Sequence, residues 1–128
     1  MDTFLMKGCN MAGQSFRDLD VWKKSLDLAV DVYKHVKFLP KEELYCLSDQ
    51  MRRAAISIPS NISEGQQRYS NRDFKHFLLI AKGSLGELET QIMICERLEY
   101  LTREQSQNLY NQCSEIGKML NGLINHIQ

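Results

Sequence analysis

The sequence lacks any hydrophobic run long enough to cross a membrane, and its first residues lack the basic-then-apolar order of a secretory signal. A transmembrane helix needs about 18 consecutive apolar residues. None of the 4 cysteines stands in a CxxC pair, and three of them fall inside helical patterns. We therefore expect a reduced, cytoplasmic protein that does not associate with membranes.

Charge of one sign is also missing. Lys plus Arg and Asp plus Glu each number 16, so the formal net charge is zero. Without an excess of either sign, the chain as a whole has no electrostatic attraction to nucleic acid or to a membrane surface. Any site for an anion must therefore be a local cluster.

Catalytic motifs are absent as well. The sequence contains no Gly-x-Ser-x-Gly elbow and no phosphate-binding glycine loop. A carboxylate-bridged metal pair in a helix bundle needs two Glu-x-x-His motifs, and only Asp73 and His76 have a comparable spacing. We expect no catalytic residues, no metal and no cofactor, and the cysteines are interpreted as small core side chains.

What is present is the composition of one globular domain. The chain has 128 residues, of which 43% are hydrophobic and 25% are charged. Residues 1–14 show no periodicity and are predicted to be a disordered leader, within which Met1, Met6 and Met11 are alternative starts. Residues 15–128 are predicted to form the folded domain.

Apolar residues recur at helical spacing through that domain, which predicts four helices. The second is expected to begin at Pro40 and to continue through Pro59 with a bend near Ala55, because the apolar period does not shift there. Ser70 is expected to cap the third helix, and Thr102 with Gln105 to form a capping box on the fourth. The predicted core stripes are Leu19, Trp22, Leu26, Ala29, Tyr33 and Val36; Leu44, Leu47, Met51, Ala54, Ile58 and Ile62; Phe74, Phe77, Ala81, Leu85, Leu88, Ile92 and Cys95; and Leu109, Cys113, Ile116, Leu120, Leu123 and Ile127.

No segment alternates with the period of two that a strand requires, and the connections between the helices are short. The sequence therefore predicts an all-α fold, an antiparallel up-down-up-down four-helix bundle.

The third helix has a second uncharged face, opposite its core stripe. Glycine inside a helix costs about 1 kcal/mol relative to alanine, and close approach of another helix would explain why glycine is tolerated there. We interpret this face as a subunit interface; the alternative is that the helix is simply central in its own bundle. The candidate interface residues are Leu79, Gly83, Gly86, Thr90, Met93 and Ile94.

Basic residues cluster around the turn between the second and third helices. Arg68, Arg72 and Lys75, with Tyr69 between them, are candidates for contacts with RNA or DNA, because cations bind phosphates and an aromatic ring stacks on bases. The alternative is a solvated loop. Arg53 is expected to have a structural role instead, as an ion pair with Asp27.

Several segments carry a resemblance to a known family. Residues 16–19 (FRDL), 21–24 (VWKK), 50–65 (QMRRAAISIPSNISEG) and 81–91 (AKGSLGELETQ) resemble the bacterial four-helix-bundle proteins encoded in intervening sequences of 23S ribosomal RNA genes. The resemblance covers nearly everything after Gln14.

This resemblance implies a bundle that assembles into a ring, commonly a homopentamer, without enzymatic activity. Similar bundles serve as accessory proteins of diversity-generating retroelements, where a basic surface engages nucleic acid. The function expected is that of a non-enzymatic, homo-oligomeric factor associated with ribosomal RNA or other nucleic acid. The alternative is a purely structural or protein-interaction module.

Overall fold

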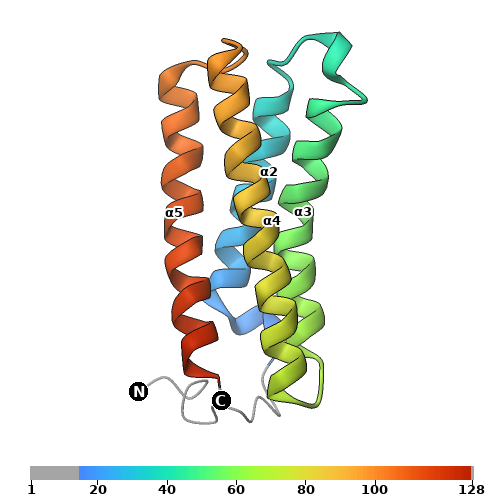
Figure 1. Ribbon diagram of the computed structural model, residues 1–128, viewed down its shortest axis with the longest axis vertical. Coiled ribbons are helices and arrows are strands. Elements are labelled where there is room, and N and C mark those ends of the chain that lie inside the picture. Colours follow the sequence, from blue (N-terminus) through green and yellow to red (C-terminus); the bar gives the residue numbers. More distant parts are fainter. Residues whose placement is uncertain (1–14, 128) are drawn as a thin grey trace.

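The computed structural model describes residues 15–127, and that part of the chain is helical with no strand. The predicted leader, residues 1–14, and its three candidate start methionines lie outside the described residues. Figure 1 shows four long helices side by side, with successive helices running in opposite directions, which confirms the predicted four-helix bundle. The elements are η1 (Phe16–Asp18), α2 (Asp20–Val36), η2 (Lys41–Glu43), α3 (Leu47–Gln66), α4 (Asn71–Arg97) and α5 (Arg103–His126).

Each long helix packs mainly against two others. The helix α3 contacts α2 and α4, and α5 contacts the same two helices. The helices α2 and α4 therefore occupy opposite corners of the bundle, and both run in the same direction (Figure 1). No helix in the described part of the chain is long and apolar enough to span a membrane.

The core stripes predicted for α4 and α5 are confirmed. All six residues of the α5 stripe are buried, and in α4 only Phe77 is partly exposed. The helix boundaries follow the predicted caps. Ser70 accepts a hydrogen bond from the Asp73 N–H at 3.1 Å, and Thr102 and Gln105 form a reciprocal capping box.

The stripe predicted for α2 is wrong at two of its six positions. Leu19 and Val36 are buried, and Trp22 and Ala29 are partly buried and pack against the core. Leu26 and Tyr33 are 38% and 42% exposed. The buried positions are Val21, Ser25, Leu28, Val32 and Val36. Ser25 interrupts the true stripe in the sequence, but its hydroxyl donates to the Trp22 carbonyl at 2.7 Å, so it is buried without a lost hydrogen bond. The helix thus carries an apolar arc that is wider than its buried side, and Leu26 and Tyr33 lie at the exposed edge of that arc.

The predicted start of the second helix is also wrong. A short 3-10 turn occupies Lys41–Glu43, and α3 begins at Leu47. The backbone of Cys46 (φ −119°, ψ −102°) separates the two elements, and Leu44, predicted to be buried, is 45% exposed. Glu43 fixes this connection to the far end of α4 by accepting a hydrogen bond from the Tyr100 hydroxyl at 2.9 Å.

The path of α3 through Pro59 is as predicted. The helix is continuous from Leu47 to Gln66, with Pro59 buried inside it. The bend near Ala55 stays a prediction.

Close packing of α3 on α4 depends on small side chains. The hydroxyls of Ser57 and Ser84 are 2.8 Å apart. Further along, a Cβ atom at Gly65 would lie 2.6 Å from the Phe77 Cβ and 3.2 Å from the Phe74 carbonyl oxygen. Glycine at position 65 therefore allows the last turn of α3 to approach the first turns of α4.

This packing leads to a test with two matched glycines. We expect Gly65→Ala to lower the free energy of unfolding by about 1–3 kcal/mol, because the added methyl forces α3 and α4 apart. Gly122, on α5, has nothing within 4 Å of its Cβ position. Gly122→Ala should therefore raise the free energy of unfolding by about 0.5–1 kcal/mol. Urea denaturation of both variants measures the difference, and equal effects would contradict the packing described.

Candidate nucleic-acid and subunit interfaces

The four residues predicted to contact nucleic acid come together on the surface at one end of the bundle. Arg68 and Tyr69 lie in the turn after α3, and Arg72 and Lys75 lie on the first turns of α4. All four are exposed, and Tyr69 is as exposed as in an extended chain, at 107%. We call these four residues the basic turn.

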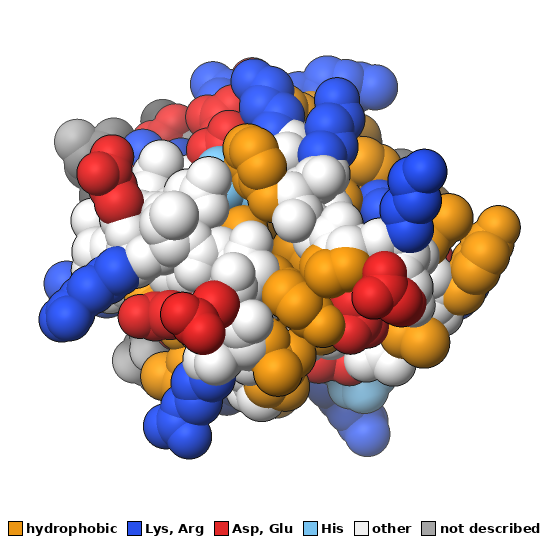
Figure 2. Space-filling model, turned by 90° about the horizontal axis from the view of Figure 1, so that it is seen from above, with side chains coloured by type: hydrophobic (Ala, Val, Ile, Leu, Met, Phe, Trp, Pro, Cys, Tyr) orange, Lys and Arg blue, Asp and Glu red, His pale blue; other side chains and the backbone are white. Residues whose placement is uncertain are grey.

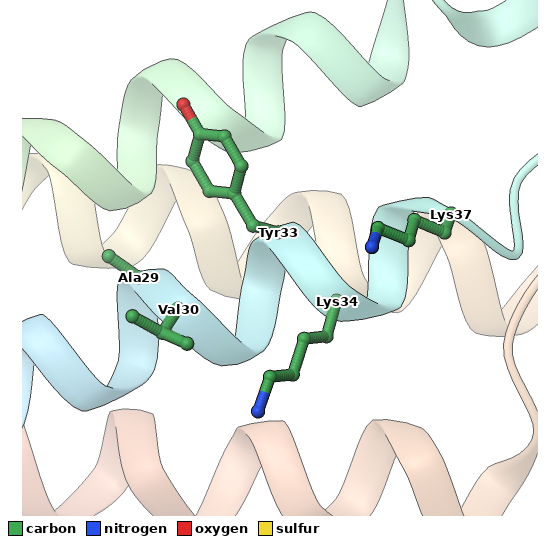
Figure 3. A pocket seen from close by; sticks show the side chains of 5 residues that line it. All are labelled: Ala29, Val30, Tyr33, Lys34 and Lys37. Atoms are coloured by element: carbon green, nitrogen blue, oxygen red, sulfur yellow. The ribbon is translucent and has the colours of Figure 1, made fainter.

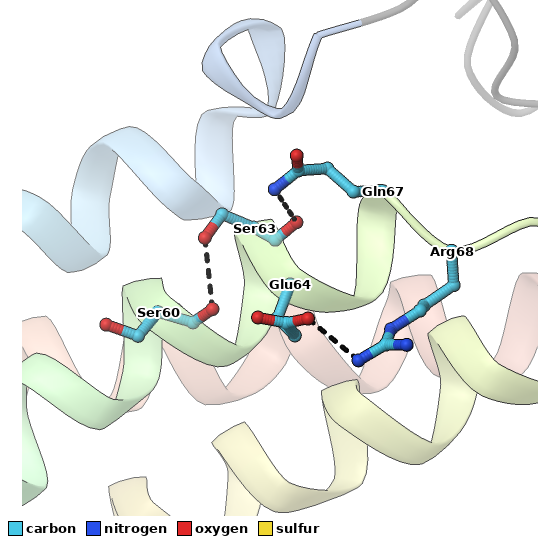
Figure 4. A network of polar contacts seen from close by, with 5 residues as sticks. All are labelled: Ser60, Ser63, Glu64, Gln67 and Arg68. Carbon is cyan, nitrogen blue, oxygen red and sulfur yellow. Dashed lines mark hydrogen bonds and ion pairs between the residues drawn. The ribbon is translucent and has the colours of Figure 1, made fainter.

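Arg68 differs from the other cations because its charge is already partly compensated. Its guanidinium forms an ion pair with Glu64 at 2.8 Å and lies 4.8 Å from the centre of the Phe77 ring. Figure 4 shows this ion pair beside a hydrogen bond that the Gln67 side-chain amide donates to the Ser63 carbonyl. Ser63 lies in the last turn of α3, so this bond gives a partner to a carbonyl at the end of the helix. Arg68 therefore holds the turn in place as well as contributing charge.

Arg72 and Lys75 are free to bind an anion. No ion pair involves either residue within residues 15–127. They are three positions apart on α4, so they lie on the same side of the helix. The basic turn therefore offers two uncompensated cations next to an exposed aromatic ring.

Two other arginines, near them in sequence, are not part of this cluster. Arg52 and Arg53 lie near the start of α3, at the opposite end of the bundle from the basic turn. Arg53 pairs with Asp49 at 2.9 Å, so the predicted ion pair with Asp27 is wrong. Arg53 and Asp49 are four residues apart on one helix, so their ion pair needs no contact between helices.

The end opposite the basic turn has mixed character. In Figure 2, which looks onto that end, Lys and Arg side chains project around the rim, with Asp and Glu between them and hydrophobic side chains in the middle. Exposed apolar residues there include Phe38, Leu44, Tyr45 and Leu98. The charges at this end therefore do not form a second basic patch.

The candidate subunit interface is an exposed strip along α4. Leu79, Met93 and Ile94 are 49%, 54% and 42% exposed. All six predicted residues are exposed and share the side of α4 opposite its buried stripe. We call this strip, Leu79, Gly83, Gly86, Thr90, Met93 and Ile94, the α4 face.

The two glycines of the α4 face have no role inside the bundle. A Cβ atom at Gly83 or Gly86 would meet nothing within 4 Å. The Thr90 hydroxyl donates a hydrogen bond to the Gly86 carbonyl at 2.9 Å, so its one donor is already used within the helix. Packing within one subunit therefore does not explain why glycine, with its helix penalty, occupies these positions.

A second exposed apolar group was missed by the sequence analysis. Leu26, Val30 and Tyr33 of α2, with Ile56 of α3, are each 38–53% exposed. Leu26 and Tyr33 were assigned to the core, and their exposure is the part of the α2 prediction that is wrong. The sequence did contain a sign of this exposure, because the apolar residues of α2 span a wider arc of the helix than the bundle core can bury.

The buried thiols are poor nucleophiles. Burial raises the pKa of Cys95 to about 11 and that of Cys113 to about 12, each from 9.0. Nearby carboxylates, Glu43 and Glu89 respectively, add to these increases. Among the described residues, no group of three or more His, Cys, Asp or Glu side chains is arranged to hold a metal ion.

Comparisons with known proteins agree with this architecture. The sequence profile of the family described as 23S rRNA-intervening sequence protein matches residues 17–122. The chain is also similar to a crystal structure of a protein with unknown function from the S23 ribosomal protein family of Bacteroides thetaiotaomicron VPI-5482. The two share 38% sequence identity over 82% of this chain and 95% of that one, with a TM-score of 0.76. No curated protein matches the chain.

The burial of the cysteines predicts a pattern of reactivity. In a Cys9→Ser variant, the exposed thiol of Cys46 should react quickly with a thiol reagent, whereas Cys95 and Cys113 should react only when the protein unfolds. Mass spectrometry of the labelled protein in buffer and in urea counts the modified thiols. Adding Cys46→Ser should remove the fast reaction; rapid labelling of Cys95 or Cys113 in the native protein would show that the core is more open than described.

Proposed function

The chain belongs to the family of 23S rRNA-intervening sequence proteins, and from this premise we propose that it is a non-enzymatic, homo-oligomeric factor that contacts RNA or DNA. The basic turn is the observation that carries the nucleic-acid part of the proposal. The α4 face supports the assembly part. Both surfaces are exposed, and neither is part of the core of a single subunit.

The chemistry of the basic turn fits a nucleic-acid strand. Arg72 and Lys75 can each contact a phosphate, and these contacts need no particular base. Tyr69 presents its ring to solvent, where it can stack on an unpaired base. Stacking of this kind contributes about 1–3 kcal/mol per base, so we propose single-stranded or looped RNA or DNA as the ligand.

Assembly compensates for the small size of this site. One subunit has no net charge and offers two free cations at the turn. A homo-oligomer, with a pentamer favoured by the family resemblance, repeats the turn once per subunit. Linked sites raise avidity by about 100-fold to 10,000-fold when one ligand spans them.

The α4 face also supports a second function. A module that binds another protein would use an exposed apolar strip of this kind without any contact to nucleic acid. The zero net charge of the chain favours this alternative. The two functions differ in one respect, because only the first requires the basic turn.

The assembly can be tested by measuring molecular mass. We expect light scattering to give a multiple of the 14.9 kDa subunit mass, with the pentamer favoured. Gly83→Arg should reduce the mass to that of one subunit, because a long charged side chain then stands in the middle of the α4 face. Gly122→Arg is the matched control, since Gly122 is also helical and open but lies on α5. A monomeric wild-type protein, or a Gly83→Arg variant of unchanged mass, would rule out the α4 face as the interface.

Nucleic-acid binding can be tested across a salt series. We expect the intact oligomer to retain ribosomal RNA fragments on a filter at low salt and to lose them steeply as salt rises. Replacing Arg72 and Lys75 with alanine should weaken binding and reduce the slope of log K against log salt by about 2 per engaged turn, about 1 for each lost phosphate contact. Tyr69→Ala should weaken binding without changing that slope.

The control for this test removes the same charge elsewhere. Arg103 and Lys118 are exposed on α5, away from the basic turn. The double alanine variant at these two positions should bind almost as the wild type does. If both double variants behave alike, or if the wild-type oligomer retains no RNA or DNA at low salt, the protein-interaction function replaces the one proposed.

A further inference from the structure

A groove lies where the end of α2 meets the start of α3, at the end of the bundle opposite the basic turn. Its volume is about 460 Å³, and sites for small molecules typically measure about 300–1,000 Å³. Residues of α2, of α3 and of the connection that contains η2 all line it. We call it the α2–α3 groove. Separate elements of the chain therefore build a hollow of the right size for a small molecule.

Cations from these separate elements converge on the groove. Lys37 directly follows α2, Lys41 belongs to η2, and Arg52 belongs to α3. All three line the groove, whereas no Asp or Glu does. Among the residues that the structure describes, none of the three forms an ion pair. Like charges gathered in one hollow repel each other, so a bound anion would stabilise this arrangement.

The carboxylates at this end of the bundle do not neutralise the groove. Asp and Glu side chains lie between the cations of the rim in Figure 2, but those nearest in sequence are placed elsewhere. Glu43 accepts a hydrogen bond from the Tyr100 hydroxyl at 2.9 Å, and Asp49 pairs with Arg53 at 2.9 Å. Glu42 is exposed and does not line the groove. The counter-charge is therefore left for a ligand to supply.

Arg52 is held in position to meet such a ligand. Its Nη2 donates a hydrogen bond to the Leu44 carbonyl at 3.3 Å, and its guanidinium lies 6.0 Å from the centre of the Tyr33 ring. A guanidinium has five N–H donors, and within residues 15–127 Arg52 makes no other hydrogen bond. A side chain that is already fixed loses less conformational freedom when a ligand binds. Arg52 therefore offers free donors at a defined position.

The number of cations indicates which anion fits. A phosphate monoester carries a charge of about −1.5 to −2 at pH 7 and presents three strong acceptor oxygens. A single carboxylate carries only one negative charge, which would leave the three cations of the groove undercompensated. The planar fork of arginine also matches the geometry of a phosphate. A phosphate monoester is therefore the anion that suits this groove.

The other walls indicate that the ligand has an apolar part as well. Inorganic phosphate would be bound by cations and polar groups alone, without any apolar wall. The groove has apolar side chains around its cations, and the Tyr33 ring, which is 42% exposed, is available for stacking on an aromatic group. The apolar residues that line it are Val36, Leu39, Pro40 and Leu44.

Room for that apolar part continues along α2. A neighbouring hollow of about 420 Å³ shares Tyr33 and Lys37 with the groove and is lined further by Ala29, Val30 and Lys34. Figure 3 shows this hollow, with Tyr33 extending from α2 toward α3. Its lining again contains cations and apolar side chains and no carboxylate. A flat ring system can therefore lie against Tyr33 while its phosphate reaches Arg52.

We propose that the α2–α3 groove binds a nucleoside monophosphate, with Arg52, Lys37 and Lys41 contacting the phosphate and Tyr33 contacting the base. This site goes beyond the function proposed above, because it needs neither the basic turn nor the assembly of subunits. The same chemical group occurs in a free nucleotide and at a phosphorylated 5′ end of an RNA strand.

Titration calorimetry on the full chain tests the ligand class. The probes are adenosine 5′-monophosphate, adenosine and inorganic phosphate. We expect the nucleotide to bind, and the other two to bind at least tenfold more weakly, because each keeps only one half of the contacts. Absence of nucleotide binding would overturn the proposal. Equal affinity for inorganic phosphate would also overturn it, because the groove would then hold a small anion without recognising a nucleotide.

Two adjacent arginines of α3 provide a matched pair of variants. Arg52→Gln should weaken nucleotide binding about 10-fold to 100-fold, because it removes charge-assisted hydrogen bonds to the phosphate. Arg53→Gln should leave the affinity unchanged, since the Arg53 side chain is 78% exposed, pairs with Asp49 and does not line the groove. Equal effects of the two substitutions would contradict the site.

A second variant avoids any loss of structure at the start of α3. Arg52→Gln also removes the bond to the Leu44 carbonyl, whereas Lys37 and Lys41 are exposed and form no hydrogen bond or ion pair in the described part of the chain. Lys37→Gln/Lys41→Gln should therefore stay fully helical by circular dichroism and still bind the nucleotide about tenfold more weakly. Unchanged affinity in this variant would overturn the proposal.

The basic turn supplies the remaining control. Arg72→Ala/Lys75→Ala should bind the nucleotide as the wild type does, and Arg52→Gln should retain ribosomal RNA fragments as the wild type does. Loss of nucleotide binding in the basic-turn variant alone would place the nucleotide there and overturn the α2–α3 groove as the site. The groove and the basic turn can therefore fail independently of each other.

The source of the nucleotide is distinguished by competition. Short RNA oligonucleotides with and without a 5′-phosphate are added to the protein before the titration. Competition that requires the 5′-phosphate supports binding of an RNA end in the groove. Absence of competition by either oligonucleotide supports a free nucleotide as the ligand. Equal competition by both would overturn recognition of a phosphate monoester.

Discussion

The organisation of this protein depends on α4 having two uncharged faces when one bundle can bury only one. Its core stripe packs against α3 and α5, and the close contact with α3 is possible because Gly65, Ser57 and Ser84 are small. The opposite strip, with Gly83 and Gly86 at its centre, is left exposed. A strip of this kind is stable in water only at a cost, and covering it with another subunit removes that cost. The proposed homo-oligomer and the proposed repetition of the basic turn both follow from this constraint.

The parts of the fold that the sequence predicted correctly are those set by local rules. The stripes of α4 and α5 contain few polar interruptions, and the caps at Ser70 and Thr102 need only residues within one turn. The buried side of α2 could not be predicted in the same way, because it includes Ser25, which is polar. Ser25 is buried without a lost hydrogen bond, since its hydroxyl donates to the Trp22 carbonyl. The start of α3 was missed for a different reason. The connection that precedes it is joined to the segment after α4 by a hydrogen bond between Glu43 and Tyr100, and no local pattern reveals a contact between residues 57 positions apart.

The candidate site shows the same division. Composition and spacing were sufficient to predict that Arg72, Lys75 and Tyr69 are exposed near the turn, because exposure there follows from local structure. The ion pair of Arg68 with Glu64, four residues earlier, follows a local rule and was overlooked, whereas the contact of Arg68 with the Phe77 ring forms only because α3 and α4 approach at Gly65. The exposure of Leu26 and Tyr33 was missed because an apolar period alone does not show how much of an apolar arc the chain's own core covers.

The central claim is that the α4 face is covered in solution, and oxidation of Met93 tests it most directly. Met93 is 54% exposed in the single subunit, whereas Met51 is fully buried and serves as the internal reference. Sulfoxide formation by peroxide can be followed for both residues by mass spectrometry. Our account predicts that Met93 is protected in the wild-type oligomer and becomes reactive in the Gly83→Arg variant, while Met51 stays protected in both. Rapid oxidation of Met93 in the wild-type protein, at the rate found in the variant, would contradict it.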